Sequence, residues 1–259
     1  MRTALVTGAA RGIGAAVVDR LAADGWQVVA VDVCADVPGA GYPLGTEEQL
    51  KALAGRRPGA VLPVVADVRD PEALERAVRL AHEEFGALDA AVAAAAVMAG
   101  GRPLWETTDD EWDVLFETGV RGVARLARAA VPALLARPAP RSGRFVAVAS
   151  AAAHRGLWHL AGYNAAKHAV VGLVRGLAAD LRGTGVTATA VSPGSTRTAM
   201  LDASADLYGL ADPEEFARHQ LVDRLLEPQE VAAAICWLCG EQSSAVTGTV
   251  VHADGGFTT

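Results

Sequence analysis

Three residues in the middle of the chain have the types and spacing needed to move a proton to or from an alcohol. Tyr163 and Lys167 are four residues apart, which places a phenol and an ammonium on one face of a helix. Ser150 precedes Tyr163 by thirteen residues and ends a predicted strand. A phenol with a pKa of about 10 needs roughly 4 kcal/mol to act as a base near neutral pH, and one positive charge about 4 Å away supplies a similar amount. We therefore expect Tyr163 to be the acid–base group, Ser150 to hold the reacting oxygen, and Lys167 to lower the pKa of the tyrosine.

A Tyr-x-x-x-Lys pair alone is common on surface helices, so the prediction of an enzyme also depends on the glycine-rich start of the chain. Gly8-Ala9-Ala10-Arg11-Gly12-Ile13-Gly14 lies directly between the first predicted strand and the first predicted helix. A dinucleotide pyrophosphate needs a tight turn, a close backbone and a helix N-terminus. Glycines allow the turn and the close approach because they lack Cβ. The position of this string predicts a dinucleotide site.

Asp32 selects between the two nicotinamide dinucleotides. It ends the second predicted strand, eighteen residues after Gly14. A carboxylate there accepts hydrogen bonds from both adenosine ribose hydroxyls and repels a 2′-phosphate. Arg11 is a counterargument, because a guanidinium can serve NADP. No second basic residue stands beside Asp32, so we expect NAD.

The elements around these residues alternate between strand and helix patterns. Helices are expected between the strands, one of them capped by Asp70 with Pro71 in its first turn, and others starting near Asp109 and Tyr163. Repeated units of this kind require a parallel sheet with right-handed crossovers. The sequence predicts an α/β fold, one Rossmann-type doubly wound domain over residues 1–259 with helices on both faces. The expected strands are Thr3–Thr7, Gln27–Val33, Val61–Ala66, Leu88–Val97, Arg144–Ser150, Val186–Ser192 and Thr249–His252.

Two stretches interrupt this rhythm. Cys34–Gly45 is rich in Gly and Pro and leads into a short helix that Thr46 and Gln49 can cap as a box. It is either a surface loop or a flap over the cofactor, since it follows the strand that must reach the ribose. Met200–Arg224 mixes polar and apolar residues and is either a substrate lid or a solvated helical pair.

Composition restricts the partners and the compartment. The formal net charge of −7 argues against nucleic acid and anionic membranes. The longest Ala/Val run, 90–99, is too short to span a bilayer, and the first strand leaves no room for a targeting segment. Cys34, Cys236 and Cys239 form no metal or redox pattern, so we expect buried thiols, no metal, and a cytoplasmic location.

From Thr7-Gly8 to Asp254-Gly255-Gly256 the chain resembles the short-chain dehydrogenase/reductase family. The resemblance implies a seven-stranded sheet, a homotetramer, Asp67-Val68 beside the adenine, Pro193-Gly194 after the sixth strand, and Thr196 and Thr198 near the nicotinamide amide. The expected catalytic residues are Ser150, Tyr163 and Lys167. The expected cofactor-binding residues are Gly8, Arg11, Gly12, Ile13, Gly14, Asp32, Asp67, Val68, Ala93, Ala94, Tyr163, Lys167, Pro193, Gly194, Thr196 and Thr198.

Within the family, Asp32-Val33-Cys34 and the Tyr42-Pro43-Leu44 insertion resemble the mycofactocin-coupled subgroup. That resemblance implies tightly held NAD(H) that is reoxidised by an external acceptor rather than exchanged. The chain departs from the family pattern twice. Ala93–Ala96 stands where the family has Asn-Asn-Ala-Gly, and Gly119 stands where it has an asparagine that holds a relay water near the catalytic lysine. The chain therefore lacks the asparagine on which the usual proton route depends.

The expected function is interconversion of an alcohol and a carbonyl compound. An exchangeable NAD(P) enzyme of the same family, an epimerase or dehydratase, and a non-catalytic NAD(H) sensor are the alternatives. A sensor has no need of Ser150, Tyr163 and Lys167 together. Substrate contacts are expected from the ranges Gly100–Trp105, Ala152–His159 and Met200–Tyr208, in which His154 and His159 are either pocket residues or ordinary polar residues.

Overall fold

A single parallel sheet of seven strands organises the molecule, in the order β3-β2-β1-β4-β5-β6-β7. The computed structural model describes residues 1–259. The predicted α/β, Rossmann-type doubly wound fold is confirmed. The strands are β1 (Thr3–Thr7), β2 (Gln27–Asp32), β3 (Val61–Val65), β4 (Ala90–Ala93), β5 (Arg144–Val148), β6 (Thr187–Pro193) and β7 (Val250–Ala253).

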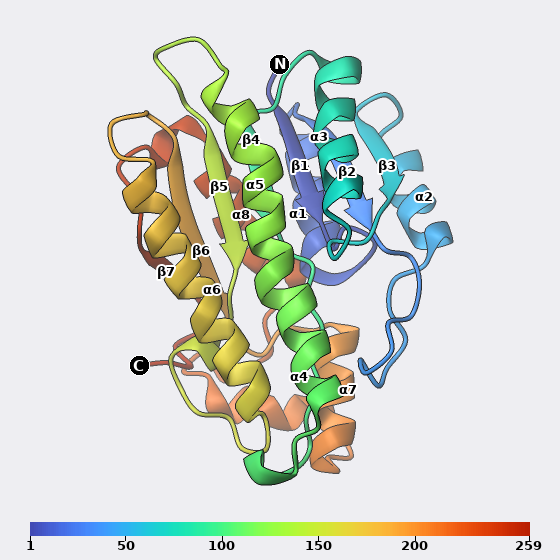
Figure 1. Cartoon of the computed structure of the whole chain (residues 1–259). Coiled ribbons are helices and arrows are strands. Elements are labelled where there is room, and N and C mark those ends of the chain that lie inside the picture. Colours follow the sequence, from blue (N-terminus) through green and yellow to red (C-terminus); the bar gives the residue numbers. More distant parts are fainter.

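Helices cover both faces of this sheet, with α5 and α6 in front of it and α1 and α8 behind it in Figure 1. The larger of the two main core clusters packs α3, α5 and α6 on one face, and the other packs α1, α2 and α8 on the opposite face. The helices are α1 (Gly12–Ala23), α2 (Glu47–Gly55), α3 (Pro71–Phe85), α4 (Asp109–Phe116), α5 (Gly122–Leu135), α6 (Ala161–Asp180), α7 (Ala199–Tyr208) and α8 (Pro228–Cys239). None of them is both long enough and apolar enough to cross a bilayer.

Two-sided burial explains why most strand positions are apolar. Phe145 of β5 belongs to the cluster under α5 and α6, whereas its neighbour Val146 belongs to the cluster under α1 and α8. Alternate side chains point to opposite faces of a strand, so a strand with helices on both sides needs apolar residues throughout. Local signals set the helix ends: the Asp70 side chain accepts hydrogen bonds from the amides of Glu72 and Ala73 at the start of α3.

Two predicted elements are shorter or less regular than expected. The fourth strand ends at Ala93 instead of Val97, because the Thr7 hydroxyl takes the next two amides, those of Ala94 and Ala95. The predicted long helix from Asp109 is divided by a π-helical turn, Glu117–Arg121. This turn lies beside α6, and turns of this kind often mark functional sites.

The carboxyl ends of the strands meet at one end of the molecule, towards which the arrowheads point in Figure 1. Beyond them lie α7 and the 3-10 helix η4 (Pro213–His219), so the 200–224 stretch is a helical pair placed over this edge. The 34–45 stretch also turns back towards the edge: Val37 and Ala40 are buried against Val97 and Met98. The capping box of Thr46 and Gln49 is confirmed at the start of α2.

Candidate active site

One cavity of about 1120 Å³ opens at the carboxyl edge of the sheet. Its walls come from the ends of the strands, the first turn of α1, the 34–45 stretch, α6, α7 and η4. Ligands of open α/β sheets bind at this edge. The volume exceeds the range of about 300–1,000 Å³ for common small-molecule pockets, so a dinucleotide and a second molecule can share it.

The glycine turn forms one end of the cavity and fits a dinucleotide phosphate. A Cβ on Gly14 would overlap the carbonyl oxygen of Gly8, and a Cβ on Gly8 would lie 2.8 Å from Cα of Ala95. Gly8 also has a φ of 69°, which side chains rarely adopt. Helix α1 begins at Gly12, so its first amides lack partners within the helix and face this end of the cavity.

Asp32 is held rigidly at the same end. Its Oδ2 accepts a hydrogen bond from the Ala10 amide at 2.9 Å, and its Oδ1 accepts one from the Cys34 amide at 3.1 Å. Its side chain still lines the cavity. Arg11 does not neutralise it, because the guanidinium lies over the ring of Tyr42, with its Cζ 5.5 Å from the centroid. A 2′-phosphate here would meet a carboxylate, which favours NAD.

The remaining predicted cofactor residues also line the cavity, with one exception. Ile13, Asp67, Val68, Pro193, Gly194, Thr196 and Thr198 all lie in its wall. Ala93 does not, because it is buried within β4 and is 4 % exposed. The wall begins one residue later and is formed by Ala94, Ala95 and Ala96. This correction follows from the early end of β4.

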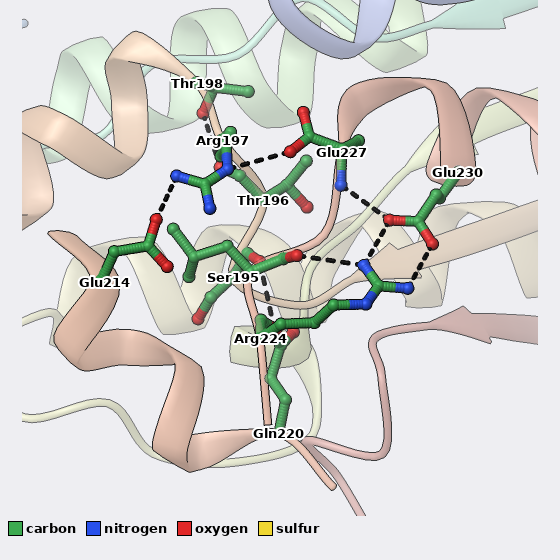
Figure 2. Close-up of polar contacts among 10 residues, drawn as sticks. Ser195, Thr196, Arg197, Thr198, Glu214, Gln220, Arg224, Glu227 and Glu230 are labelled. Carbon is green, nitrogen blue, oxygen red and sulfur yellow. Dashed lines mark hydrogen bonds and ion pairs between the residues drawn. The ribbon is translucent and has the colours of Figure 1, made fainter. Parts of the chain in front are cut away.

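Ion pairs fix the loop that carries Thr196 and Thr198, as Figure 2 shows. Between these two residues, Arg197 pairs with Glu214 of η4 and, at 2.9 Å, with Glu227. Thr198 also caps α7, since its hydroxyl accepts a hydrogen bond from the Leu201 amide at 3.3 Å. The cofactor wall and the helices above the cavity are thereby connected through one arginine.

The three predicted catalytic residues come together in the middle of the cavity wall. Tyr163 and Lys167 lie on the first turns of α6, and Ser150 follows β5 as the cap of a short 3-10 helix. Tyr163 is 8 % exposed and Lys167 is 4 % exposed. The lysine Nζ donates a hydrogen bond to the Val148 carbonyl at 3.0 Å. It lies 5.6 Å from the centroid of the tyrosine ring.

The charge state of this group differs from the prediction. Burial raises the pKa of Tyr163 to about 12, although the neighbouring hydroxyl of Ser150 opposes this rise. Burial lowers the pKa of Lys167 to about 8. The expected lowering of the tyrosine pKa by the lysine is therefore wrong for the protein without cofactor. Burial dominates the pKa of both residues, because it disfavours the charged form of each.

Thr118 is a cavity residue that no sequence motif predicts. It lies in the π-helical turn, is 7 % exposed, and its Oγ1 has no hydrogen-bond partner. It lines the same cavity as Lys167. The next residue, Gly119, leaves open space, because a Cβ there would meet no atom within 4 Å. A glycine in the middle of a helical pattern was the only signal of this irregular turn.

Two of the three ranges expected to reach the substrate contribute residues to the cavity wall. Ala152–His159 contributes Trp158 and its three preceding residues, and Met200–Tyr208 contributes four residues. No residue of Gly100–Trp105 lines the cavity, and Gly101 packs against Leu207 instead. His154 bonds to Ser192 through Nε2 at 2.9 Å and His159 stacks on Trp158, so neither histidine faces the cavity. Met200 does, with its Sδ 3.9 Å from the hydroxyl of Tyr163.

Known proteins are similar to this chain in sequence and fold over nearly its whole length. The sequence model of the enoyl-(acyl carrier protein) reductase family matches residues 8–258. An A-factor type γ-butyrolactone 1′-reductase from Streptomyces virginiae is 38 % identical, with 99 % of this chain and 95 % of the relative covered. A (−)-trans-carveol dehydrogenase from Rhodococcus erythropolis is 33 % identical, with coverage of 99 % and 97 %. The structure of carveol dehydrogenase from Mycobacterium avium in complex with NAD has a TM-score of 0.93 and 30 % identity, with coverage of 99 % and 97 %.

Proposed function

This chain belongs to the short-chain dehydrogenase/reductase family, and we propose that it uses Tyr163 as its acid–base group and retains NAD between turnovers. It is an NAD-dependent oxidoreductase that interconverts alcohols and carbonyl compounds. The observation that carries the proposal is the meeting of Ser150, Tyr163 and Lys167 in the wall of the cavity that begins at the glycine turn. An apolar alcohol suits the substrate side, which Met98, Leu160 and Met200 help to line.

The cofactor fits the residues described above, with Asp32 at the ribose hydroxyls and the start of α1 at the pyrophosphate. When bound, NAD⁺ supplies the acceptor for the hydride that leaves the carbinol carbon. In our proposal the Ser150 hydroxyl orients the substrate oxygen. The Tyr163 hydroxyl exchanges a proton with that oxygen, and the ammonium of Lys167 stabilises the phenolate.

The pKa values set the direction in which each residue works most easily. With a pKa of about 12, Tyr163 is protonated near neutral pH and is ready to donate to a carbonyl oxygen. Alcohol oxidation needs the phenolate, and a positive charge close by favours it. Lys167, with a pKa of about 8, is mostly charged near neutral pH but loses its charge as the pH rises. We therefore expect the charge of Lys167, and not the free tyrosine, to limit oxidation on the alkaline side.

Retention of NAD is supported by the way the 34–45 stretch closes on the cavity. Its ends are tied together, because the Asp36 carboxylate accepts a hydrogen bond from the Leu44 amide at 2.8 Å. Its far side is tied to the chain after β4, because the Tyr42 hydroxyl accepts one from the Met98 amide at 3.3 Å. Val37 and Leu44 line the cavity. We propose that this stretch is a flap over the adenosine half of NAD.

Apolar contacts give the scale of this retention. Burying a methyl or methylene group contributes about 0.8 kcal/mol, and each 1.4 kcal/mol slows release roughly tenfold if association is unchanged. A few such contacts from Val37, Leu44 and Ala94–Ala96 therefore slow release by tens to hundreds of times. An external acceptor of the mycofactocin type would then reoxidise the cofactor in place.

The expected homotetramer and cytoplasmic location stay predictions.

The test uses purified protein that has been dialysed extensively. Mass spectrometry of the denatured protein should still detect NAD(H), and alcohol oxidation should proceed faster with an artificial electron acceptor than with free NAD⁺. Tyr163→Phe should keep its NAD(H) but lose single-turnover hydride transfer. Loss of cofactor on dialysis together with brisk production of free NADH would refute retention. Substantial turnover by the Phe variant would refute the role of the tyrosine.

A further inference from the structure

The cavity changes its charge from one end to the other. Its only carboxylates, Asp32 and Asp67, lie at the end expected to hold adenosine, where Arg11 also lines the wall and Asp67 pairs with Arg69. The part beyond Tyr163 is lined by Arg155, Arg218 and His219 and by no acidic residue. The chain as a whole carries a formal charge of −7, so this basic end does not simply reflect a basic protein.

Phe257 connects two of the three basic residues, although they come from distant parts of the chain. The Arg155 Nη1 donates a hydrogen bond to the Phe257 carbonyl at 2.7 Å, and its Cζ lies 5.9 Å from the ring centroid. The His219 ring meets the same ring edge-on, with centroids 6.0 Å apart. The contact with the Phe257 carbonyl leaves the positive charge of Arg155 without a counter-ion. The segment after β5, the end of η4 and the C-terminal segment thus form one wall.

Arg218 has no partner, whereas the arginines on either side of it are paired. Figure 2 shows Arg197 between Glu214 and Glu227, and Arg224 in a two-pronged pair with Glu230 at 2.7 Å for each bond. Glu214, on the same helix η4 as Arg218, is thus already engaged. No ion pair or side-chain hydrogen bond is found for Arg218, and its side chain lines the cavity. Its charge is therefore available to a ligand.

Between Tyr163 and these basic residues the wall is mostly apolar, with Ser204 and Tyr208 as its polar members. Its side chains include Leu157, Leu160, Met200, Leu210 and Phe216. Such a surface suits a hydrocarbon body, because removing apolar area from water is favourable. A ligand that fills this part of the cavity and matches its wall therefore has three parts. It carries a reacting oxygen at Tyr163, an apolar body in the middle and a negative group at Arg218.

We propose that Arg218, with Arg155 and His219, forms a subsite for the carboxylate of a hydroxy acid or oxo acid with an apolar body. This inference rests on the proposed function, because it places the reacting oxygen at Ser150 and Tyr163. A planar guanidinium matches a carboxylate and can bind it with two parallel hydrogen bonds. The subsite makes the enzyme prefer acids over neutral alcohols of the same shape.

Binding can be measured without turnover. The probes are 4-cyclohexylbutanoate and its neutral counterpart 4-cyclohexylbutanol, each titrated by calorimetry into the protein saturated with NADH. We expect the acid to bind about tenfold more tightly, a difference of about 1.4 kcal/mol. Arg218→Gln should abolish most of that preference and leave the affinity for the alcohol unchanged. Arg182→Gln is the matched control, because Arg182 is exposed, has no ion pair and lies outside the cavity wall.

Three results would overturn the subsite: equal binding of the two probes, failure of the acid to bind, or a preference that survives in Arg218→Gln. If that variant loses affinity for NADH while keeping the preference, the arginine serves the cofactor and the proposal is also wrong. Turnover of neutral secondary alcohols is measured separately in wild type. Its absence would count against the proposed function, whereas the ratio of the two binding constants tests the subsite alone.

Discussion

Replacing Lys167 with methionine should stabilise the cofactor-free protein while it removes activity. The Nζ of Lys167 is buried, has the Val148 carbonyl as its hydrogen-bond partner, and forms no ion pair. Burial lowers its pKa from 10.5 to about 8. At 1.36 kcal/mol for each pH unit, this difference corresponds to about 3 kcal/mol of destabilisation while the lysine is charged. Methionine keeps the length of the chain and carries no charge.

The sign of the pH dependence follows from the lowered pKa. Below pH 8 the lysine is charged in both states, and the folded state carries the full cost. Between pH 8 and 10.5 the unfolded state binds more protons, so this cost disappears as the pH rises. At pH 7 we expect the free energy of unfolding of Lys167→Met to exceed that of wild type by about 1–3 kcal/mol. The gain is smaller than the full cost of the buried charge, because the hydrogen bond to Val148 is lost. Above pH 10.5 the advantage should vanish.

The assay is urea unfolding of cofactor-free protein, followed by circular dichroism at pH 7, 9 and 10.5. Lys51, the only other lysine of the chain, provides the control. It is exposed and pairs with Glu47, which raises its pKa, so Lys51→Met should produce no gain at pH 7. A Lys167→Met variant that is less stable than wild type at pH 7 would refute the reasoning. A gain of equal size at pH 7 and pH 10.5 would refute it too, because the charge would then not be its source.

Three further changes test other parts of the site. Asp32→Ser should raise the affinity for NADPH relative to NADH by at least tenfold in fluorescence titrations, and an unchanged ratio would show that another group selects the cofactor. Gly119→Asn should fold and change the oxidation rate only a few-fold, since its Cβ meets nothing, whereas Gly122→Asn should unfold at lower urea because its Cβ would lie 2.9 Å from Val68. Arg197→Gln breaks the ion pair with Glu214 that ties η4 to the cofactor wall, and also the ion pair with Glu227 before α8, so stopped-flow displacement should show NADH leaving several-fold faster. An unchanged rate would mean that these contacts do not gate release.

Residues fixed by local pattern and by the parallel sheet could be predicted from the sequence. The glycine turn follows the first strand, and Asp32 ends the second, so parallel pairing of β1 with β2 brings both to one edge. Tyr163 and Lys167 share a helix face because of their spacing alone. For these residues the chain order already determines the position, once the helix and strand periods are known.

Other parts depend on contacts that no local pattern records. The irregular turn that carries Thr118 forms where α4 and α5 meet α6, and a helix pattern predicts a continuous helix there. Arg218 and Phe257 reach one wall only because η4 and the C-terminal segment meet in space. The error about the Tyr163 pKa has the same origin, because the degree of burial, which dominates that pKa, depends on packing.

Two polar side chains of the cavity wall, those of Thr118 and Lys167, are hydrogen-bonded less completely than the buried Arg144. Arg144, 2 % exposed, donates to the carbonyls of Gly143, Gly240 and Glu241, as expected where burial would otherwise be costly. Thr118 has no partner for its hydroxyl, and Lys167 has one carbonyl for an ammonium with three donors. Both residues line the same cavity, where a ligand can supply the missing partners. Proteins depart from full satisfaction mainly at functional sites, because groups that must bind a ligand or move a proton cannot be fully bonded beforehand.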